Sequence, residues 1–282
     1  MQGVSRATAA AGAESLEALL AAAARNAPDL AARNAPDPAV VGEQLFAVTD
    51  VLAGAAGLRR ALTDPSREGE AKAALVARLF GGKLDGAVVD LLAGLVRGRW
   101  SRAGDLVDAI EGYAVSAVLA GAERTGRLDD VEDELFRFGR TVAGDQGLRD
   151  AFSSRTEGTA RKAELVHTLL GGRAAPETLR LAVQAATRPR GLRTEQVLEL
   201  FVEAAAERRR QLVAHVVAAL PLTEQQRSRL AASLQRRYGR PIRLNIDVDP
   251  DVVGGLRVEV SGEVVDGTIA ARLDEARRRL AG

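Results

Sequence analysis

One stretch decides the fold of the C-terminal part of the chain, residues 221–273: PLTEQQRSRLAASLQRRYGRPIRLNIDVDPDVVGGLRVEVSGEVVDGTIAARL. Leu230, Leu234 and Tyr238 recur every four residues and form one apolar stripe, which predicts an amphipathic helix. Gly239 readily adopts the left-handed conformation that ends a helix, so the helix is expected to stop there. A strand pattern follows at once, and this part of the chain is therefore predicted to be a small α+β domain.

The residues after this helix alternate with a period of two. Residues 242–248 place apolar side chains on one face and polar ones on the other, as in a half-buried strand. Residues 256–260 alternate in the same way, and residues 261–263 carry a hairpin-turn signal. A last amphipathic helix is predicted by three apolar residues that share one face: Ile269, Leu273 and Leu280.

Two turns frame these strands. Gly254 and Gly255 precede the strand at 256–260 and are expected to hold a backbone conformation that a β-branched residue cannot reach. Asp266 and Gly267 form the turn before the last helix, where Asp266 or Thr268 is able to cap the helix. These four residues are predicted to be structural.

Composition limits the classes of protein to which the chain can belong. Of its 282 residues, 46% are hydrophobic and 27% charged, which is typical of a globular protein of two or three domains. The net charge of +1 does not indicate a nucleic-acid-binding protein, and the absence of cysteine excludes disulfides and thiolate metal sites. No apolar run approaches the roughly 20 residues needed to cross a bilayer, so the protein is expected to be soluble.

An internal repeat accounts for the length of the chain. Residues 45–82 match residues 135–172 at a constant shift of 90, without a gap. The matched pairs include Leu-Phe, Gly-Leu-Arg, Lys-Ala, Leu-Val and Gly-Gly at equivalent positions. A period this long exceeds that of a solenoid unit and indicates a duplicated helical domain.

The repeat divides the chain into three predicted domains. Residues 1–104 form a first helical bundle, residues 105–210 a second one, and residues 211–282 the α+β domain. The β-branched residues between 213 and 217 are predicted to form a strand that pairs with the later sheet. The predicted fold class is mainly α, with two tandem helical bundles followed by a short mixed-sheet domain.

The C-terminal stretch resembles a known family. The motifs that carry the resemblance are Pro221-Leu222-Thr223, Tyr238-Gly239, Gly254-Gly255-Leu256-Arg257-Val258, Val265-Asp266-Gly267-Thr268 and Arg272-Leu273. They are similar to those of the delta subunit of bacterial rotary ATP synthases, called the oligomycin-sensitivity-conferring protein in mitochondria. Residues 113–138 resemble the opening helices of the N-terminal domain of that family. Residues from about 105 to 282 thus resemble a complete compact delta subunit, preceded by an extra copy of the helical domain.

The resemblance implies a non-catalytic stator subunit of the F-type proton-translocating ATP synthase. Such a subunit would link the N-terminal helix of the alpha subunit, in the catalytic F1 head, to the C-terminal end of the b subunit in the peripheral stalk. It would resist the torque of the rotor and so support ATP synthesis coupled to proton transport. It would lie at the cytoplasmic face of the bacterial cell membrane, held there by its partners only.

The resemblance also places two sets of candidate contact residues on this sequence. A groove for the alpha-subunit helix is expected at residues with mostly small side chains: Tyr113, Ala114, Ala117, Leu181, Ala182, Ala185 and Ala186. Contacts with the peripheral stalk are expected at residues of the C-terminal domain: Arg227, Leu234, Arg237, Ile269, Leu273 and Leu280.

Two alternatives belong to other functional classes. A basic cluster runs through Arg208, Arg209, Arg210, Arg227, Arg229, Arg236, Arg237, Arg240 and Arg243, and it would suit a nucleic-acid-binding protein. The other alternative is an enzyme with an unrecognised acidic site.

Motifs for catalysis and for cofactor or metal binding are weak. Gly81-Gly82-Lys83 lacks the rest of a phosphate loop and is better explained by a helix C-cap, as is Gly171-Gly172. The only histidines, His167 and His215, lack metal-ligand spacing. No catalytic residue, cofactor or metal is therefore predicted, and no nucleic acid is expected as a partner.

Overall fold

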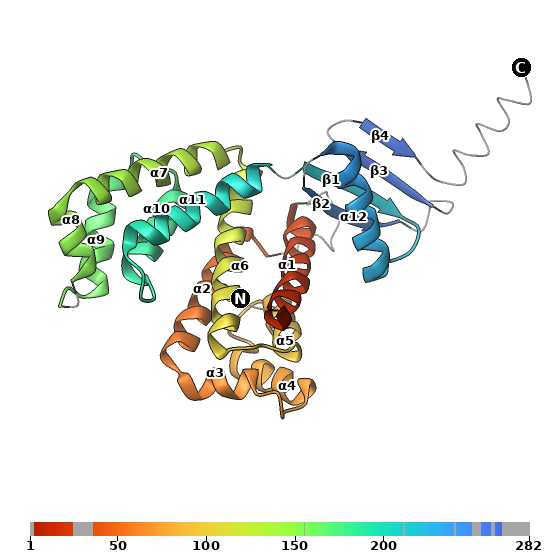
Figure 1. The fold of residues 1–282 in the computed structure, drawn as a ribbon, viewed down its shortest axis with the longest axis horizontal. Coiled ribbons are helices and arrows are strands. Elements are labelled where there is room, and N and C mark those ends of the chain that lie inside the picture. The colour runs from red at the N-terminus through yellow and green to blue at the C-terminus, as the bar shows by residue number, and fades with distance from the viewer. Residues whose placement is uncertain are drawn as a thin grey trace, which may run out of the picture. The chain divides into compact units, whose positions relative to one another are not determined.

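The computed structural model describes residues 3–24, 36–154, 156–210, 212–239, 241–249, 255–260 and 263–266. The chain forms two compact units, a first unit of residues 1–206 and a second unit of residues 207–282. The described elements of the first unit are helices, and the second unit adds a small sheet (Figure 1). The predicted fold class, mainly α with a small α+β C-terminal part, is confirmed.

Eleven described helices begin in the first unit. They are α1 (Gly3–Ala24), α2 (Pro38–Gly54), α3 (Ala56–Thr63), α4 (Gly69–Phe80), α5 (Gly86–Arg97), α6 (Ala103–Arg124), α7 (Leu128–Gly144), α8 (Gln146–Ser153), α9 (Thr159–Leu170), α10 (Pro176–Thr187) and α11 (Thr194–Arg210). One contiguous core of buried apolar residues extends from α1 to α11. The second unit has a separate, smaller core.

Four helices recur in the structure at the shift found in the sequence. The bounds of α7, α8, α9 and α10 are those of α2, α3, α4 and α5 moved by 90 residues. We name α2–α5, residues 38–97, the first repeat, and α7–α10, residues 128–187, the second repeat. This identity of bounds supports the interpretation of the first unit as a duplication.

Equivalent local contacts hold the two repeats. The amide of Gly81 donates to the Ala77 carbonyl at 2.8 Å, and the amide of Gly171 donates to the His167 carbonyl at 2.8 Å. The glycine that follows each of them, at position 82 or 172, has a positive φ of 71° or 70°. The Gly-Gly pairs therefore end helices, as the sequence indicates.

Helix α6 contacts both repeats. It packs against α1, against α2 and α3 of the first repeat, and against α7 and α10 of the second repeat. The approach of α2 is close, because a Cβ atom on Gly42 would lie 2.8 Å from Val118 Cγ2. Helix α1 is tied to α6 by a buried hydrogen bond of 2.7 Å from Ser5 Oγ to Asp105 Oδ2. The helical part of the chain is thus built around a single helix that both repeats share.

The close contact of α2 with α6 predicts opposite effects for two glycine-to-alanine changes. Gly42→Ala forces the added methyl group against Val118, and overpacking of this kind costs about 1–3 kcal/mol. Gly112→Ala, in the exposed middle of α6, meets no atom within 4 Å and should stabilise the helix by about 0.5–1 kcal/mol. Chemical denaturation of the two variants measures both values. Equal stabilisation by the two changes would show that α2 and α6 do not approach so closely.

The second unit is a four-stranded mixed sheet with one described helix. Its elements are β1 (Leu212–Ala218), α12 (Glu224–Tyr238), β2 (Ile242–Val248), β3 (Leu256–Val260) and β4 (Glu263–Asp266), and the strand order is β2-β1-β3-β4. Strand β1 pairs with β2 in parallel and with β3 in antiparallel orientation, and β3 and β4 form an antiparallel pair. The predicted pairing of the strand near residues 213–217 with the later sheet is confirmed.

Helix α12 packs on this sheet through the stripe seen in the sequence. Leu234 is buried with the strand residues Val216 and Val258, and Leu230 and Tyr238 pack against the same cluster. A capping box starts α12, since Thr223 and Gln226 each bond the backbone amide of the other. Gly239, with a φ of 67°, ends it. The predicted last helix, with Ile269, Leu273 and Leu280, lies outside the described residues.

Gly255 leads into β3 with a φ of 84°, and Gly254 lies outside the described residues. We expect Gly255→Val to destabilise the second unit by about 1–2 kcal/mol, because an L side chain is strained in left-handed backbone space. Gly255→Asn should destabilise the second unit less than Gly255→Val does, since Asn tolerates the left-handed conformation better. Thermal unfolding followed by circular dichroism compares the two variants. A melting curve that Gly255→Val leaves unchanged would contradict the conformational role.

Candidate functional site

The structure buries all seven residues predicted to line the alpha-subunit groove. Ala114, Ala117, Leu181, Ala182, Ala185 and Ala186 are fully buried, and Tyr113 is 6% exposed. The Tyr113 hydroxyl donates to the Ala9 carbonyl of α1 at 2.5 Å, and burial raises the pKa of this phenol. The seven residues belong to the core of the first unit, where they pack against other helices of the same chain. A partner can therefore approach them only through the surface next to them.

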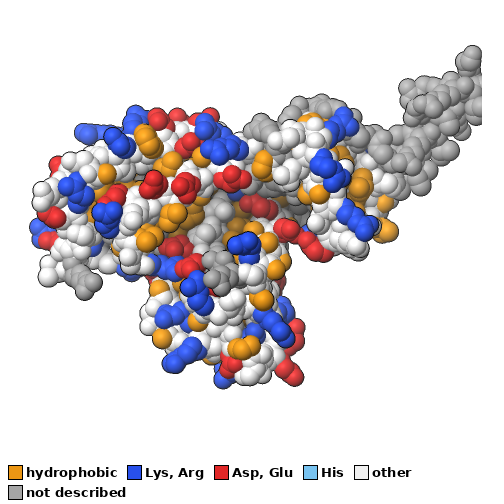
Figure 2. Space-filling view, in the orientation of Figure 1, with side chains coloured by type: hydrophobic (Ala, Val, Ile, Leu, Met, Phe, Trp, Pro, Cys, Tyr) orange, Lys and Arg blue, Asp and Glu red, His pale blue; other side chains and the backbone are white. Residues whose placement is uncertain are grey.

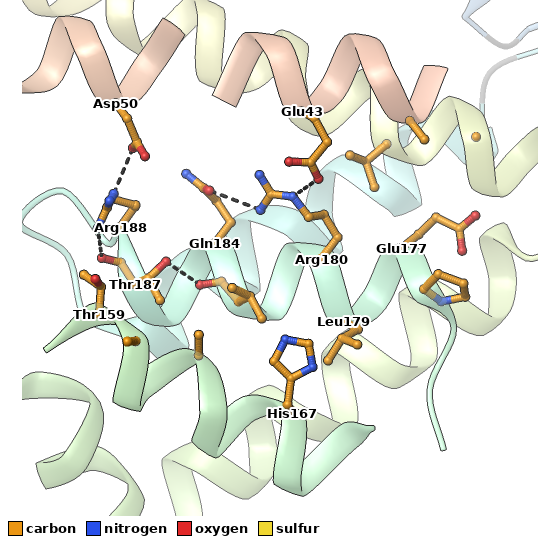
Figure 3. A pocket seen from close by; sticks show the side chains of 17 residues that line it. Glu43, Asp50, Thr159, His167, Glu177, Leu179, Arg180, Gln184, Thr187 and Arg188 are labelled. Atoms are coloured by element: carbon orange, nitrogen blue, oxygen red, sulfur yellow. Dashed lines mark hydrogen bonds and ion pairs between the residues drawn. The ribbon is translucent and has the colours of Figure 1, made fainter. Parts of the chain in front are cut away.

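An open groove lies at that surface, between α2, α9 and α10, and has a volume of about 750 Å³ (Figure 3). Val118 and Gly121 of α6 also line it. Its apolar lining includes Ala39 of α2, Ala160 and Ala163 of α9, and Leu179 and Val183 of α10. None of the seven predicted residues lines it. Because one wall comes from α2, far away in the sequence, no local pattern of the second repeat indicated this groove.

Charged contacts join α2 to α10 along this groove. Glu43 and Arg180 form an ion pair, and the Nε atom of Arg188 lies 3.0 Å from Asp50 Oδ1 (Figure 3). The guanidinium carbon of Arg180 lies 4.4 Å from the centre of the Phe46 ring. Partly exposed ion pairs contribute only about 0–1 kcal/mol each. Burial of Phe46 therefore contributes more to the attachment of α2, and the ion pairs orient the arginines.

Two phenylalanines at equivalent positions show that the two repeats differ in which helix surface is buried. Phe46 of α2 is 2% exposed, whereas Phe136, its equivalent in α7, is 55% exposed. Arg180 of the second repeat thus covers the Phe46 ring of α2 and pairs with Glu43 beside it. The corresponding face of α7 is open within the first unit.

This asymmetry predicts very different costs for the same substitution. Phe46→Ala removes a buried aromatic ring and should cost about 3–5 kcal/mol. Phe136→Ala, the matched control, should change the free energy of unfolding by no more than about 0.5 kcal/mol. Urea denaturation of both variants provides the comparison. Similar losses for the two would contradict the burial of the α2 face.

The residues predicted to contact the peripheral stalk separate into three groups. Leu234 faces the sheet and is 7% exposed, so it serves the core of the second unit. Arg227 is half-buried and Arg237 exposed on α12, with the Arg237 guanidinium 5.7 Å from the Tyr238 ring centre. Ile269, Leu273 and Leu280 lie outside the described residues, as does Gly267. Asp266 ends β4.

The rest of the described surface mixes charges of both signs. Figure 2 shows basic, acidic and hydrophobic side chains interspersed over the visible face of the first unit. In the part of the chain that the structure describes, no group of three or more His, Asp or Glu residues is arranged to hold a metal ion. No single described helix is both long enough and apolar enough to span a membrane. Helices α2 and α3 meet the criteria of length and apolar composition only as a pair, and the chain bends by 105° between them.

A groove with walls from three helices and small or aliphatic side chains on its floor is typical of a protein that binds a helix of a partner. Comparison with known proteins shows to which family of such helix-binding proteins the chain belongs. The family model described as ATP synthase delta (OSCP) subunit matches residues 110–280. The chain belongs to this family, and the resemblance seen in the sequence is confirmed.

Relatives extend the match over the first repeat as well. ATP synthase subunit delta of Kineococcus radiotolerans is 58% identical over 241 residues, 86% of this chain and 87% of that protein. The subunit of Beutenbergia cavernae is 48% identical over 282 residues, the full length of both chains. That of Streptomyces coelicolor is 49% identical over 281 residues, 100% of this chain and 98% of that protein. The family is a non-catalytic component of the stator, or peripheral stalk, of F-type ATP synthase.

Proposed function

We propose that this chain joins the N-terminal helix of the ATP synthase alpha subunit to the C-terminal end of the b subunit. The observation that carries the proposal is the groove of about 750 Å³ between α2, α9 and α10. It lies next to the seven buried residues at which the resemblance placed the alpha-subunit contact. The alpha helix would then lie along α10, with α2 on one side and α9 on the other.

The lining suits an amphipathic helix. Leu179, Val183 and Ala163 are partly buried and leave apolar surface in the groove. Each Leu-sized anchor that a helix buries there contributes about 1.5–3 kcal/mol. Three or four such anchors contribute about 4.5–12 kcal/mol in all, and after an association cost of at least about 4 kcal/mol they support binding that is at best micromolar. The lining also includes two charged residues that are held in ion pairs, Arg188 with Asp50 and Glu177 with Arg127.

The contact with the b subunit is assigned to the second unit. The exposed side of α12 carries Arg237, and Arg227 is half-buried on the same helix. Together with the last helix predicted from the sequence, this surface would hold an acidic end of the peripheral stalk. Its partners would keep the protein at the cytoplasmic face of the membrane, and the two contacts together would transmit the resisting torque without catalysis.

Binding of a synthetic peptide with the sequence of the alpha-subunit N-terminus of the same organism tests the groove. We expect saturable binding to the full-length chain by calorimetry. Ala160→Trp places a bulky ring in the groove from an exposed position on α9, and it should weaken binding at least about tenfold, or 1.4 kcal/mol. Thr168→Trp, on an exposed face of α9 that does not line the groove, is the matched control and should bind as the natural protein does.

Two outcomes would contradict the proposal. One is peptide binding that Ala160→Trp leaves unchanged while both variants keep the melting temperature of the natural protein. The other is the absence of peptide binding together with saturable, salt-sensitive binding of nucleic acid, which would favour the alternative of a basic nucleic-acid-binding protein.

A further inference from the structure

In each repeat, a side chain of the first helix bonds the start of the fourth. In the second repeat, the Glu134 carboxylate of α7 accepts a hydrogen bond of 2.9 Å from the amide of Ala175 and one of 2.5 Å from the hydroxyl of Thr178. Ala175 is the N-cap residue of α10, and Thr178 is fully buried in the first turn of that helix. A carboxylate is favourable at this end of a helix, because the first amides have no partner within the helix and carry the positive end of its dipole. The carboxylate that bonds the start of α10 therefore comes from a different helix, α7.

The first repeat makes the same connection with the charge on the other side. Gln44 of α2 stands at the position of Glu134, and Asp85, the N-cap residue of α5, stands at the position of Ala175. The Gln44 Oε1 atom accepts a hydrogen bond of 3.0 Å from the Asp85 amide, and its Nε2 atom donates one of 2.8 Å to Asp85 Oδ2. Val88 replaces Thr178, so no buried hydroxyl needs an acceptor here. The carboxylate thus belongs to the N-cap residue of α5, and α2 supplies a neutral amide.

These residues form two sets that are complementary only within themselves. We name Gln44, Asp85 and Val88 the first cap set, and Glu134, Ala175 and Thr178 the second cap set. A mixed contact between α7 and α5 would place the Glu134 carboxylate beside that of Asp85, where Val88 offers no hydroxyl. Two ionised carboxylates only accept hydrogen bonds, and they repel each other. The reverse mixed contact, of α2 with α10, would leave the start of α10 without the carboxylate of Glu134.

The similarity of the two repeats makes mixed contacts a hazard during folding. Four helices have identical bounds at the shift of 90, and both repeats join one core. Misassembly between equivalent elements is a characteristic failure of repeat proteins. If α5 and α10 exchange places, α7 necessarily meets α5, so the repulsion between the two carboxylates opposes every complete exchange.

We propose that the two cap sets direct helix pairing during folding, so that each repeat assembles with its own fourth helix. The difference between the sets, and not the bonds of either set alone, provides the selectivity, since specificity is a difference of affinities. This role concerns the folding of the first unit. It is independent of the partners that the protein binds.

A variant with the same cap set in both repeats tests the proposal. Glu134→Gln, Ala175→Asp and Thr178→Val together give the second repeat the first cap set, so that correct and mixed contacts are equally satisfied. Full-length chains are unfolded in urea and refolded by rapid dilution, and native chains are counted as monomers that resist limited proteolysis. We expect the ratio of native to misfolded chains to fall about tenfold, the effect of one hydrogen bond to a charged group. The urea midpoint of the native fraction should stay near that of the natural protein, because the correct contacts keep their bonds.

The matched control carries these three substitutions together with Gln44→Glu, Asp85→Ala and Val88→Thr. Its repeats differ again, with the two cap sets exchanged, and its composition is that of the natural chain. We expect it to refold as the natural protein does. A local defect at the start of α10 would persist in this control, so recovery identifies the difference between the sets as the cause.

Three outcomes would overturn the inference. The first is an unchanged ratio of native to misfolded chains in the variant with one cap set. The second is a control that misfolds as much as that variant. The third is a variant whose native fraction has a clearly lowered urea midpoint, because its correct contacts would then be impaired and pairing would not be the cause.

Discussion

The structure of the first unit depends on the packing of α6 against both repeats. A helix that contacts two bundles must be apolar on most of its circumference, and α6 meets this requirement with Leu106, Ile110, Val115 and Leu119, all at most 3% exposed. Small residues at the contacts allow the neighbouring helices to approach α6 closely. At Gly42 of α2, for example, an added Cβ atom would clash with Val118 of α6. The two repeats therefore share one core, which distinguishes them from domains joined by a linker.

This arrangement changes what the second repeat offers to a partner. In the chain, α2 covers part of the α6 surface and pairs with α10, so the small residues of α6 and α10 are used internally. The surface that remains accessible to a partner is the groove between α2, α9 and α10, which is lined by residues of both repeats. The extra helices thus take part in the proposed alpha-subunit site.

The second unit follows simpler rules. A capping box begins α12, a left-handed glycine ends it, and three apolar residues at four-residue spacing cover the sheet. The capping box and the glycine are local interactions, and the apolar stripe is a periodic pattern along the chain. For this reason the helix and the strands were predictable, and Gly255 with its positive φ stands where the turn was expected. The pairing of β1 with the later strands joins residues far apart in the chain, and it was predicted only from the β-branched composition of β1.

The sequence by itself determined the family, the fold class, the helical repeat with its shift of 90 residues and the ends of most elements, because these depend on periodicity, capping and local motifs. Only the tertiary structure decided which faces of the helices are open. Phe46 and Phe136 occupy equivalent positions in near-identical local patterns, yet one is buried and the other is exposed. The difference comes from long-range contacts, since Arg180 of α10 lies over the Phe46 ring and pairs with Glu43 of α2. The burial of Ala114 and Ala182 in the core, where the sequence suggested a groove, has the same physical reason: contacts between residues far apart in the chain leave no periodic trace in it.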